Sequence, residues 1–142
     1  MKGFQFNLEK VLEVRQIEED QVQELLVKAQ KVAREIEENI EYLERKQNDL
    51  YQYLRERTDL QLDEALLYRN FIKRNRDSIE NRKEDLKAQR DIVKERKIEY
   101  LEKRKNREVL EKLKDKRYKV FQKSVLQKEQ KEIDELAQRV QN

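Results

Sequence analysis

Residues 22–54, VQELLVKAQKVAREIEENIEYLERKQNDLYQYL, carry the pattern that decides the fold. Their apolar members are spaced alternately by three and four residues, and only Gln47 interrupts them: Val22, Leu26, Ala29, Ala33, Ile36, Ile40, Leu43, Leu50 and Leu54. This alternation marks the a and d positions of a heptad repeat, where one helix packs on another. The stretch therefore predicts a long coiled-coil helix, in which we interpret Gln47 as a tolerated polar residue rather than one that sets the register.

The same register continues toward the N-terminus with weaker packing. Leu8 and Leu12 keep the spacing, but Arg15 and Glu19 occupy the next two positions of the stripe. At this end, the helices therefore either pack loosely on each other or pack against another protein.

Almost nothing in the chain would end a helix. Among 142 residues there is one glycine, Gly3, and no proline, and 46% of the residues are charged against 36% hydrophobic. Inside a helix, Gly costs about 1 kcal/mol and Pro about 3 kcal/mol. This composition is typical of a coiled coil. The apolar side chains are numerous enough to fill the contact between two helices, but too few to form a globular core. The chain has no Cys, so disulfides are excluded.

No segment looks like a membrane or export signal. The N-terminal residues alternate polar and apolar side chains, and the longest apolar run, residues 65–68, is far too short to span a bilayer. We therefore expect a cytoplasmic protein with no direct membrane insertion.

A turn is expected near residues 57–62. The apolar stripe fails at Arg57 and Gln61, Thr58 and Gln61 have the spacing of a capping box, and Asp59 is an alternative N-cap. One uninterrupted helix would be about 200 Å long and would need partners throughout. The competing interpretation is such a continuous helix in an intermolecular dimer.

The predicted fold is all-α: two long helices, about residues 4–57 and 62–140, form an antiparallel coiled-coil hairpin in a single elongated domain, residues 1–142. In the second helix, Ile72, Ile79, Leu86, Val93 and Tyr100 are spaced by sevens. The repeat is completed by one of two polar sets, either Arg76, Lys83, Arg90 and Lys97 or Asn75, Arg82, Gln89 and Arg96. Leu8 should then lie near Lys112, and about 25 residues should extend beyond the first helix.

Charge is sorted along the chain. Residues 1–64 hold 10 Lys/Arg and 16 Asp/Glu, whereas residues 65–125 hold 21 and 11. Attraction between an acidic and a basic helix explains this sorting, and an acidic partner is the alternative. Nucleic acid is disfavoured, because acidic residues are interspersed with the basic ones and no binding motif accompanies them. With no His, no Cys and no Gly-rich loop, we expect no catalytic residue, no metal site and no cofactor.

Aromatic residues gather on both sides of the expected turn: Tyr51, Tyr53, Tyr68 and Phe71. We expect Tyr68 and Phe71 to close the end of the helix contact. The alternative is a docking patch, because exposed aromatic side chains are favoured anchors at interfaces.

Three segments resemble the flagellar FliJ family of soluble type III export proteins. They are FQFNLEKVLEVRQIEEDQVQELLVKA at residues 4–29, LLYRNFIKRNRDSIENRKEDL at residues 66–86, and NREVLEKLKDKRYKVFQKSVLQKEQKEIDELAQR at residues 106–139. Their order and spacing cover nearly the whole chain, and LEKLKDKR followed by EQKEIDELA is the most specific part.

This resemblance implies a non-enzymatic coiled coil, similar to the central stalk of rotary ATPases, that is a monomer when free. It implies insertion into the ring of the flagellar export ATPase, promotion of ring assembly and activity, contact with the cytoplasmic domain of the export gate, and a chaperone role toward export components. The protein would be peripherally associated with the membrane through the export apparatus. An unrelated coiled-coil adaptor or stalk subunit of another ATPase or secretion system is the alternative.

The resemblance also implies site residues. The residues facing the ATPase ring would be Leu8, Leu12, Arg107, Leu110, Leu113 and Arg117. The residues facing the export gate would be Leu43, Leu50, Tyr51, Phe71 and Asn75.

Overall fold

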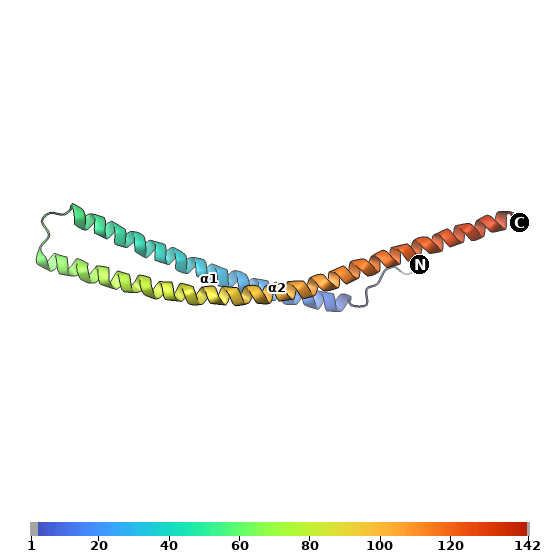
Figure 1. The fold of residues 1–142 in the computed structure, drawn as a ribbon, viewed down its shortest axis with the longest axis horizontal. Helices are drawn as coiled ribbons and strands as arrows, with labels where there is room; N and C mark the ends of the chain where they lie inside the picture. The colour runs from blue at the N-terminus through green and yellow to red at the C-terminus, as the bar shows by residue number, and fades with distance from the viewer. Residues whose placement is uncertain (1–2, 142) are drawn as a thin grey trace. The chain divides into compact units, whose positions relative to one another are not determined.

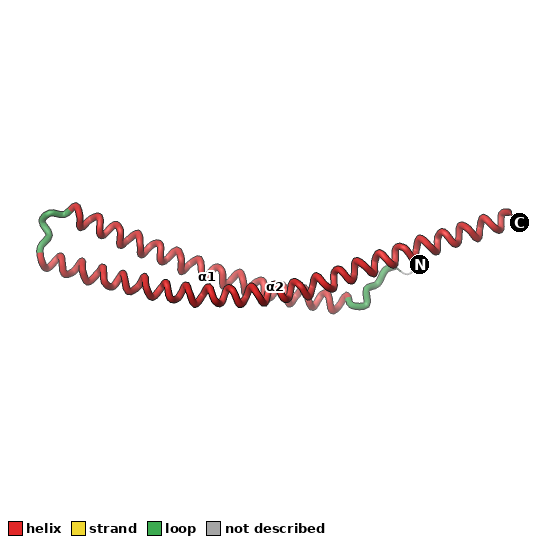
Figure 2. The backbone as a smooth tube through the Cα atoms, in the orientation of Figure 1, coloured by secondary structure: helices red, strands yellow, loops and turns green. Residues whose placement is uncertain are grey.

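The computed structural model describes residues 3–141, which form two α-helices and no strand (Figures 1 and 2). Helix α1 runs over Glu9–Glu56 and helix α2 over Leu62–Gln141. The connection between them occupies residues 57–61, so the predicted antiparallel coiled-coil hairpin with a turn near residues 57–62 is confirmed. Packing divides into two units, residues 22–99 and residues 1–21 with 100–142, which are described separately below. The single elongated domain stays a prediction.

The connection between the helices forms without glycine. No described residue other than Gly has a positive φ, so this turn does not need the left-handed conformation that glycine favours. Helix α2 begins at Leu62, and the carbonyl of Gln61 accepts the N–H of Ala65 at 2.9 Å. The expectation of an N-cap at Thr58 or Asp59 is therefore wrong. The guanidinium of Arg57 lies 3.6 Å from the Asp59 carboxylate, within the connection itself.

In the unit of residues 22–99, the predicted apolar stripe of α1 faces α2. Val22, Leu26, Ala29, Ala33 and Ile40 are buried. The central cluster joins Ala33 and Ile40 to Leu86 of α2, and Ile36 and Val93 pack against it. The small side chains at 29 and 33 leave room for long side chains from α2, which is how one apolar residue per heptad suffices on that helix.

Two members of one predicted polar set, Asn75 and Gln89, face α1, whereas Arg82 of the same set is exposed and pairs with Asp85 within α2. Asn75 is buried, and Gln89 is half-buried with its Nε2 donating to the carbonyl of Ala29 at 3.0 Å. From the competing set, Lys83 and Arg90 are exposed and reach acidic residues on the flank of α1. The N–O distances are 3.5 Å for Lys83 to Glu44 and 3.1 Å for Arg90 to Glu37. The acidic and basic helices therefore do attract each other along their flanks.

In the unit of residues 1–21 and 100–142, α1 begins at Glu9 rather than near residue 4. The preceding segment carries Phe4 and Phe6, which are two residues apart and can share one side only if the backbone is extended. Phe6 is buried, and the ring of Phe4 lies 5.2 Å from the ring of Tyr118 and 5.6 Å from that of Phe121, centroid to centroid. Packing of both rings therefore overrides the helical propensity of this segment.

The register in this unit is close to the predicted pairing of Leu8 with Lys112. Lys114 Nζ lies 2.8 Å from Glu9 Oε2, and Arg117 donates to the side chain of Asn7. Beyond Phe121, every described residue of α2 except the half-buried Val125 is exposed. The last turns of α2 thus extend without a partner helix in this unit.

Candidate partner-binding surfaces

The residues predicted to face the ATPase ring lie mainly at the contact between α1 and α2. Leu12 is only 3% exposed, and Leu8, Leu110 and Leu113 are half-buried. Leu8 immediately precedes α1, and its carbonyl accepts the N–H of Leu12 at 2.9 Å, which begins the helix. These four side chains are therefore largely covered rather than open to a partner.

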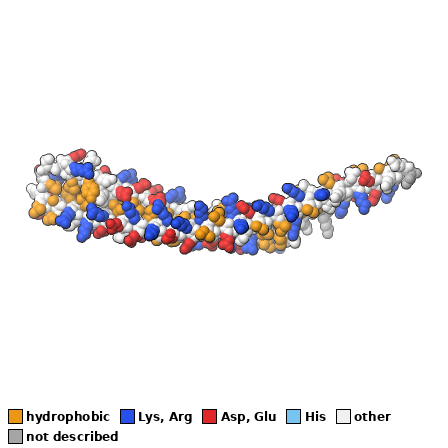
Figure 3. Space-filling model, viewed as in Figure 1, with side chains coloured by type: hydrophobic (Ala, Val, Ile, Leu, Met, Phe, Trp, Pro, Cys, Tyr) orange, Lys and Arg blue, Asp and Glu red, His pale blue; other side chains and the backbone are white. Residues whose placement is uncertain are grey.

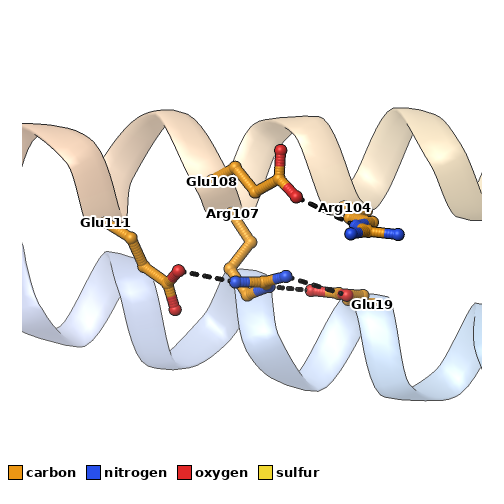
Figure 4. Close-up of polar contacts among 5 residues, drawn as sticks. All are labelled: Glu19, Arg104, Arg107, Glu108 and Glu111. Atoms are coloured by element: carbon orange, nitrogen blue, oxygen red, sulfur yellow. Dashed lines mark hydrogen bonds and ion pairs between the residues drawn. The ribbon is translucent and has the colours of Figure 1, made fainter.

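Arg107 forms an ion-pair cluster with carboxylates from both helices (Figure 4). Its Nε donates to Glu19, its Nη2 donates to Glu19 Oε1 at 3.3 Å, and its Nη1 donates to Glu111 Oε2 at 2.6 Å. Glu19 is 8% exposed, so the two-pronged contact with Arg107 compensates a buried charge. The hydrogen bond with Glu19 raises the pKa of Arg107. Glu19, which looked like a weak point of the apolar stripe, is therefore an internally satisfied polar contact.

Arg104, one turn before Arg107, forms a separate pair. Its Nε donates to Glu108 Oε1 at 2.9 Å, and this hydrogen bond raises the pKa of Arg104. Both groups belong to α2, so this i,i+4 pair supports the helix itself and does not join it to α1.

Arg117 is the ring-set residue that the structure leaves most accessible. It is exposed, it donates to Asn7, and its guanidinium carbon lies 5.6 Å from the ring centroid of Phe6. It therefore covers the Phe6 ring of the N-terminal aromatic contact while its side chain stays exposed.

Near the turn, three residues of the predicted gate set, Leu43, Tyr51 and Asn75, join one polar network. Asn75 is 7% exposed, and its Nδ2 donates to the carbonyl of Leu43 at 3.1 Å and to Gln47 Oε1 at 3.0 Å. Gln47 Nε2 in turn donates to the hydroxyl of Tyr51 at 3.1 Å. Gln47 is thus more than a tolerated polar residue, because it accepts from the buried Asn75.

Two tyrosines near the turn have pKa values shifted in opposite directions. Hydrogen bonds from Arg76 first and then Gln47 lower the pKa of Tyr51. A hydrogen bond with Tyr53, followed by burial, raises the pKa of Tyr68. The Tyr53 and Tyr68 rings also meet edge to face, with centroids 5.9 Å apart. Tyr68 is therefore half-buried beside Tyr53 of α1 at the turn end of the helix pair.

The remaining gate residues, Leu50 and Phe71, line a groove beside the turn, which we call the tip groove. Its volume is about 400 Å³, and its walls are Leu50, Arg57, Glu64, Leu67, Tyr68, Phe71 and Arg74. Figure 3 shows hydrophobic side chains gathered at the turn end of the hairpin, with Lys and Arg around them. Phe71 is 37% exposed and is therefore more open to solvent than the half-buried Tyr68.

Sequence reasoning did not single out Leu67 or Arg74. The signal was present, because Glu64, Leu67, Phe71 and Arg74 are spaced by three, four and three residues, a second helical stripe beside the main one. It was hidden because two of its four members are charged.

Over the described residues, no helix is long and apolar enough to cross a membrane. Within the same part of the chain, no group of three or more acidic side chains is arranged to hold a metal ion.

Fold and contacts together define a coiled-coil hairpin protein whose polar side chains pair both within each helix and between the two helices. A comparison with protein-family models matches residues 4–142 to the family described as Flagellar FliJ protein. The match spans nearly the whole sequence, so the chain belongs to the FliJ family, a component of flagellar protein export. This membership excludes the alternative of an unrelated adaptor. Neither the curated proteins nor the solved structures contain a match to the chain.

Proposed function

We propose that this protein is a non-catalytic, central-stalk-like rod that binds the flagellar export ATPase ring, promotes its assembly and activity, and links it to the export gate. Within this proposal it is a monomer when free, forms one elongated domain, and stays in the cytoplasm, peripherally associated with the membrane through the export apparatus. Escort of export chaperones and their clients is a further part of the role.

The observation that carries this proposal is the unpartnered end of α2. Leu126, Ile133 and Val140 are spaced by sevens, and they are 64%, 59% and 86% exposed, while Leu136 between them is 59% exposed. A single helix of this length is only marginally stable in water. An apolar stripe on such a helix is stabilised when a partner covers it, and a ring that encloses the helix would cover it from all sides.

The predicted ring contacts lie next to this end, and we keep them in the proposal with different roles. Leu8, Leu12, Leu110 and Leu113 would act by holding the helix pair together, because their side chains are largely covered, and Arg107 would do so through its ion pair with Glu19. Arg117 would contact the ring directly through its exposed guanidinium.

Steady-state ATP hydrolysis by the cognate export ATPase tests the proposal. The assay is run with and without this protein, over ATPase concentrations at which the ring is only partly assembled. We expect stimulation that shrinks once rings are complete, because a central rod stabilises a ring that is otherwise incomplete. Absence of stimulation by the folded protein would contradict the ring contact.

A matched pair of variants assigns the effect to the apolar stripe. Ile133→Asp with Leu136→Asp places two charges on the stripe, whereas Gln127→Asp with Gln138→Asp places two charges on the same stretch off the stripe. All four side chains are exposed, so neither variant should lower the melting temperature. We expect the first variant to lose stimulation and the second to keep it; equal stimulation by both would remove the stripe from the contact.

The gate contact and the monomeric state have separate tests. Sedimentation velocity should give a monomer with a high frictional ratio, and a stable dimer would contradict the stalk analogy. Titration with the cytoplasmic domain of the export gate should detect binding that Phe71→Ala weakens, with little change in melting temperature, because Phe71 is partly exposed.

A further inference from the structure

The tip groove presents a helical stripe that the hairpin itself does not use. Glu64, Leu67, Phe71 and Arg74 follow one another at steps of three, four and three residues on α2. The residues that face α1 form a different stripe, of which Tyr68 is half-buried. Alternating steps of three and four are the spacing by which one helix packs on another. Near the turn, α2 therefore carries two stripes, one covered by α1 and one open.

The dimensions of the open stripe fit a short helix. From residue 64 to residue 74 an α-helix rises about 15 Å, which is about three turns. Leu50 of α1 and Arg57 of the connection form the opposite wall, so the groove lies between the two helices beside the turn and has the position that the third helix of a bundle would take.

The apolar floor of the groove is exposed and held in place. Leu67 is 66% exposed and Phe71 is 37% exposed. Lys46 Nζ lies 5.0 Å from the centroid of the Phe71 ring, and Tyr53 stacks against the groove residue Tyr68. Aromatic side chains fixed in this way lose little conformational entropy on binding, which favours them as anchors.

The charge around the groove selects the partner. Residues 45–57 and 64–76, the two helix segments beside the turn, contain eight Lys/Arg and three Asp/Glu. The charge of Arg57 is matched by Glu64, with an N–O distance of 3.1 Å, and by Asp59. For Arg74, no hydrogen bond or ion pair is found among residues 3–141. Arg74 therefore offers the groove an open cation beside apolar anchors.

We propose that the tip groove binds a third α-helix, about three turns long, with apolar side chains at steps of three and four and Asp or Glu along the edge that meets Arg74. The apolar side chains pack on Leu67 and Phe71, and the carboxylates neutralise the basic surround. The assignment of this helix to the export gate rests on the proposed gate contact. The chemistry inferred for the helix rests on the groove alone.

Fluorescence anisotropy with designed peptides tests the chemistry without the gate. The acidic probe is a labelled helical peptide of about five turns with Leu at steps of three and four, Glu along both flanks of the Leu stripe and Ala elsewhere. In the basic probe every Glu is Lys, and in the scrambled probe the same residues lack the stripe. With the full-length protein at low salt, we expect the acidic probe to bind at least about tenfold tighter than either control, and the difference to shrink at high salt.

Two pairs of variants locate the binding. Leu67→Glu and Arg74→Glu lie in the groove, whereas Leu62→Glu and Arg69→Glu are exposed neighbours outside its walls. The groove variants should weaken the acidic probe by at least about tenfold, and the neighbours by less than about threefold. Equal binding of the acidic and basic probes, no binding of the acidic probe, or equal effects of both variant pairs would overturn the proposal. Melting curves of all four variants show that the fold is intact.

The gate domain, measured with the same variants, separates the two proposals. If the acidic probe binds in the groove and the gate domain does not bind the protein, the helix site stands and the gate contact fails. If the gate domain binds but the acidic probe does not, the gate contact stands and the inferred helix site is wrong.

Discussion

Replacing Arg107 by Leu should be far more damaging than replacing its partner Glu19 by Leu. The side chain of Glu19 is only 10% exposed, and its carboxylate accepts two hydrogen bonds from Arg107. The side chain of Arg107 is 20% exposed. Arg107→Leu leaves that buried charge without its partner. Glu19→Leu leaves Arg107 paired with Glu111 at 2.6 Å and places an apolar side chain at a position of the apolar stripe.

The expected magnitudes follow from this asymmetry. Removing one partner of a buried ion pair costs about 3–5 kcal/mol, and the partial exposure of Arg107 places its loss near 3 kcal/mol. Glu19→Leu should cost about 1 kcal/mol or less, because no buried charge is left unpaired. The double variant, with Leu at both positions, should lie within about 1 kcal/mol of the natural protein, since an apolar pair commonly replaces a buried ion pair without loss.

Native-state hydrogen exchange is the best assay for this double-mutant cycle. Glu19 and Arg107 both belong to the unit of residues 1–21 and 100–142, and we expect such a separately packed unit to open without the whole chain unfolding. Amide exchange near both positions reports that local opening, and urea unfolding followed by circular dichroism gives the global value. A coupling free energy of about 2–3 kcal/mol is expected.

Two results would refute this reasoning. One is an Arg107→Leu variant whose local stability lies within about 0.5 kcal/mol of the natural protein. The other is a double variant that loses the sum of the two single losses, which would show that the contact carries no coupling. The double variant also tests function: if stability returns but ATPase stimulation does not, Arg107 itself contacts the ring, and if both return its role is structural.

Three further predictions concern other contacts. Asn75→Ala removes two hydrogen bonds and leaves the amide of Gln47 without its buried donor, so urea unfolding should show a loss of about 2 kcal/mol; a loss below about 0.5 kcal/mol would contradict the network. In alkaline titration followed by tyrosinate absorbance, Tyr51 should ionise before Tyr68, whose pKa is raised. As pH rises through about 10, ionisation of Tyr51 therefore favours the folded state, whereas ionisation of Tyr68 disfavours it. Tyr68→Phe should therefore reduce the loss of stability at alkaline pH, and Tyr51→Phe should not. Deleting residues 124–142 should remove helical signal while shifting the melting temperature by less than about 2 °C, because these side chains are largely exposed; a larger fall would mean that this segment packs on the hairpin.

The sequence predicted the elements of the fold because their signals are local. The spacing of apolar residues in 22–54 required only a helical period, and the failure of that spacing at Arg57 placed the turn. The start of α1 was predicted too early, because packing of Phe4 and Phe6 on α2 competes with helix formation and depends on residues more than a hundred positions away.

The polar contacts between the helices could not be predicted for the same reason. Glu19 and Arg107 are 88 residues apart in sequence, and Asn75 and Gln47 are 28 apart. Each of these residues alone looks like a defect in an apolar stripe. Only the register in which α1 and α2 pair shows that these polar residues face each other. A change of one residue in the length of the connection would alter that register.

That register is itself favoured by the polar contacts. An apolar stripe with steps of three and four can pair equally well after a slip of seven residues, because every knob then meets an equivalent hole. Such a slip would separate Asn75 from Gln47, or Glu19 from Arg107, and would leave a buried polar group without a partner at a cost of about 1–3 kcal/mol each. Each of the two packing units contains one of these contacts, so each unit has its own penalty against slipping. The correct register also keeps Leu50 opposite Phe71 across the tip groove, so the polar contact at Asn75 maintains the surface on which the third helix is proposed to bind.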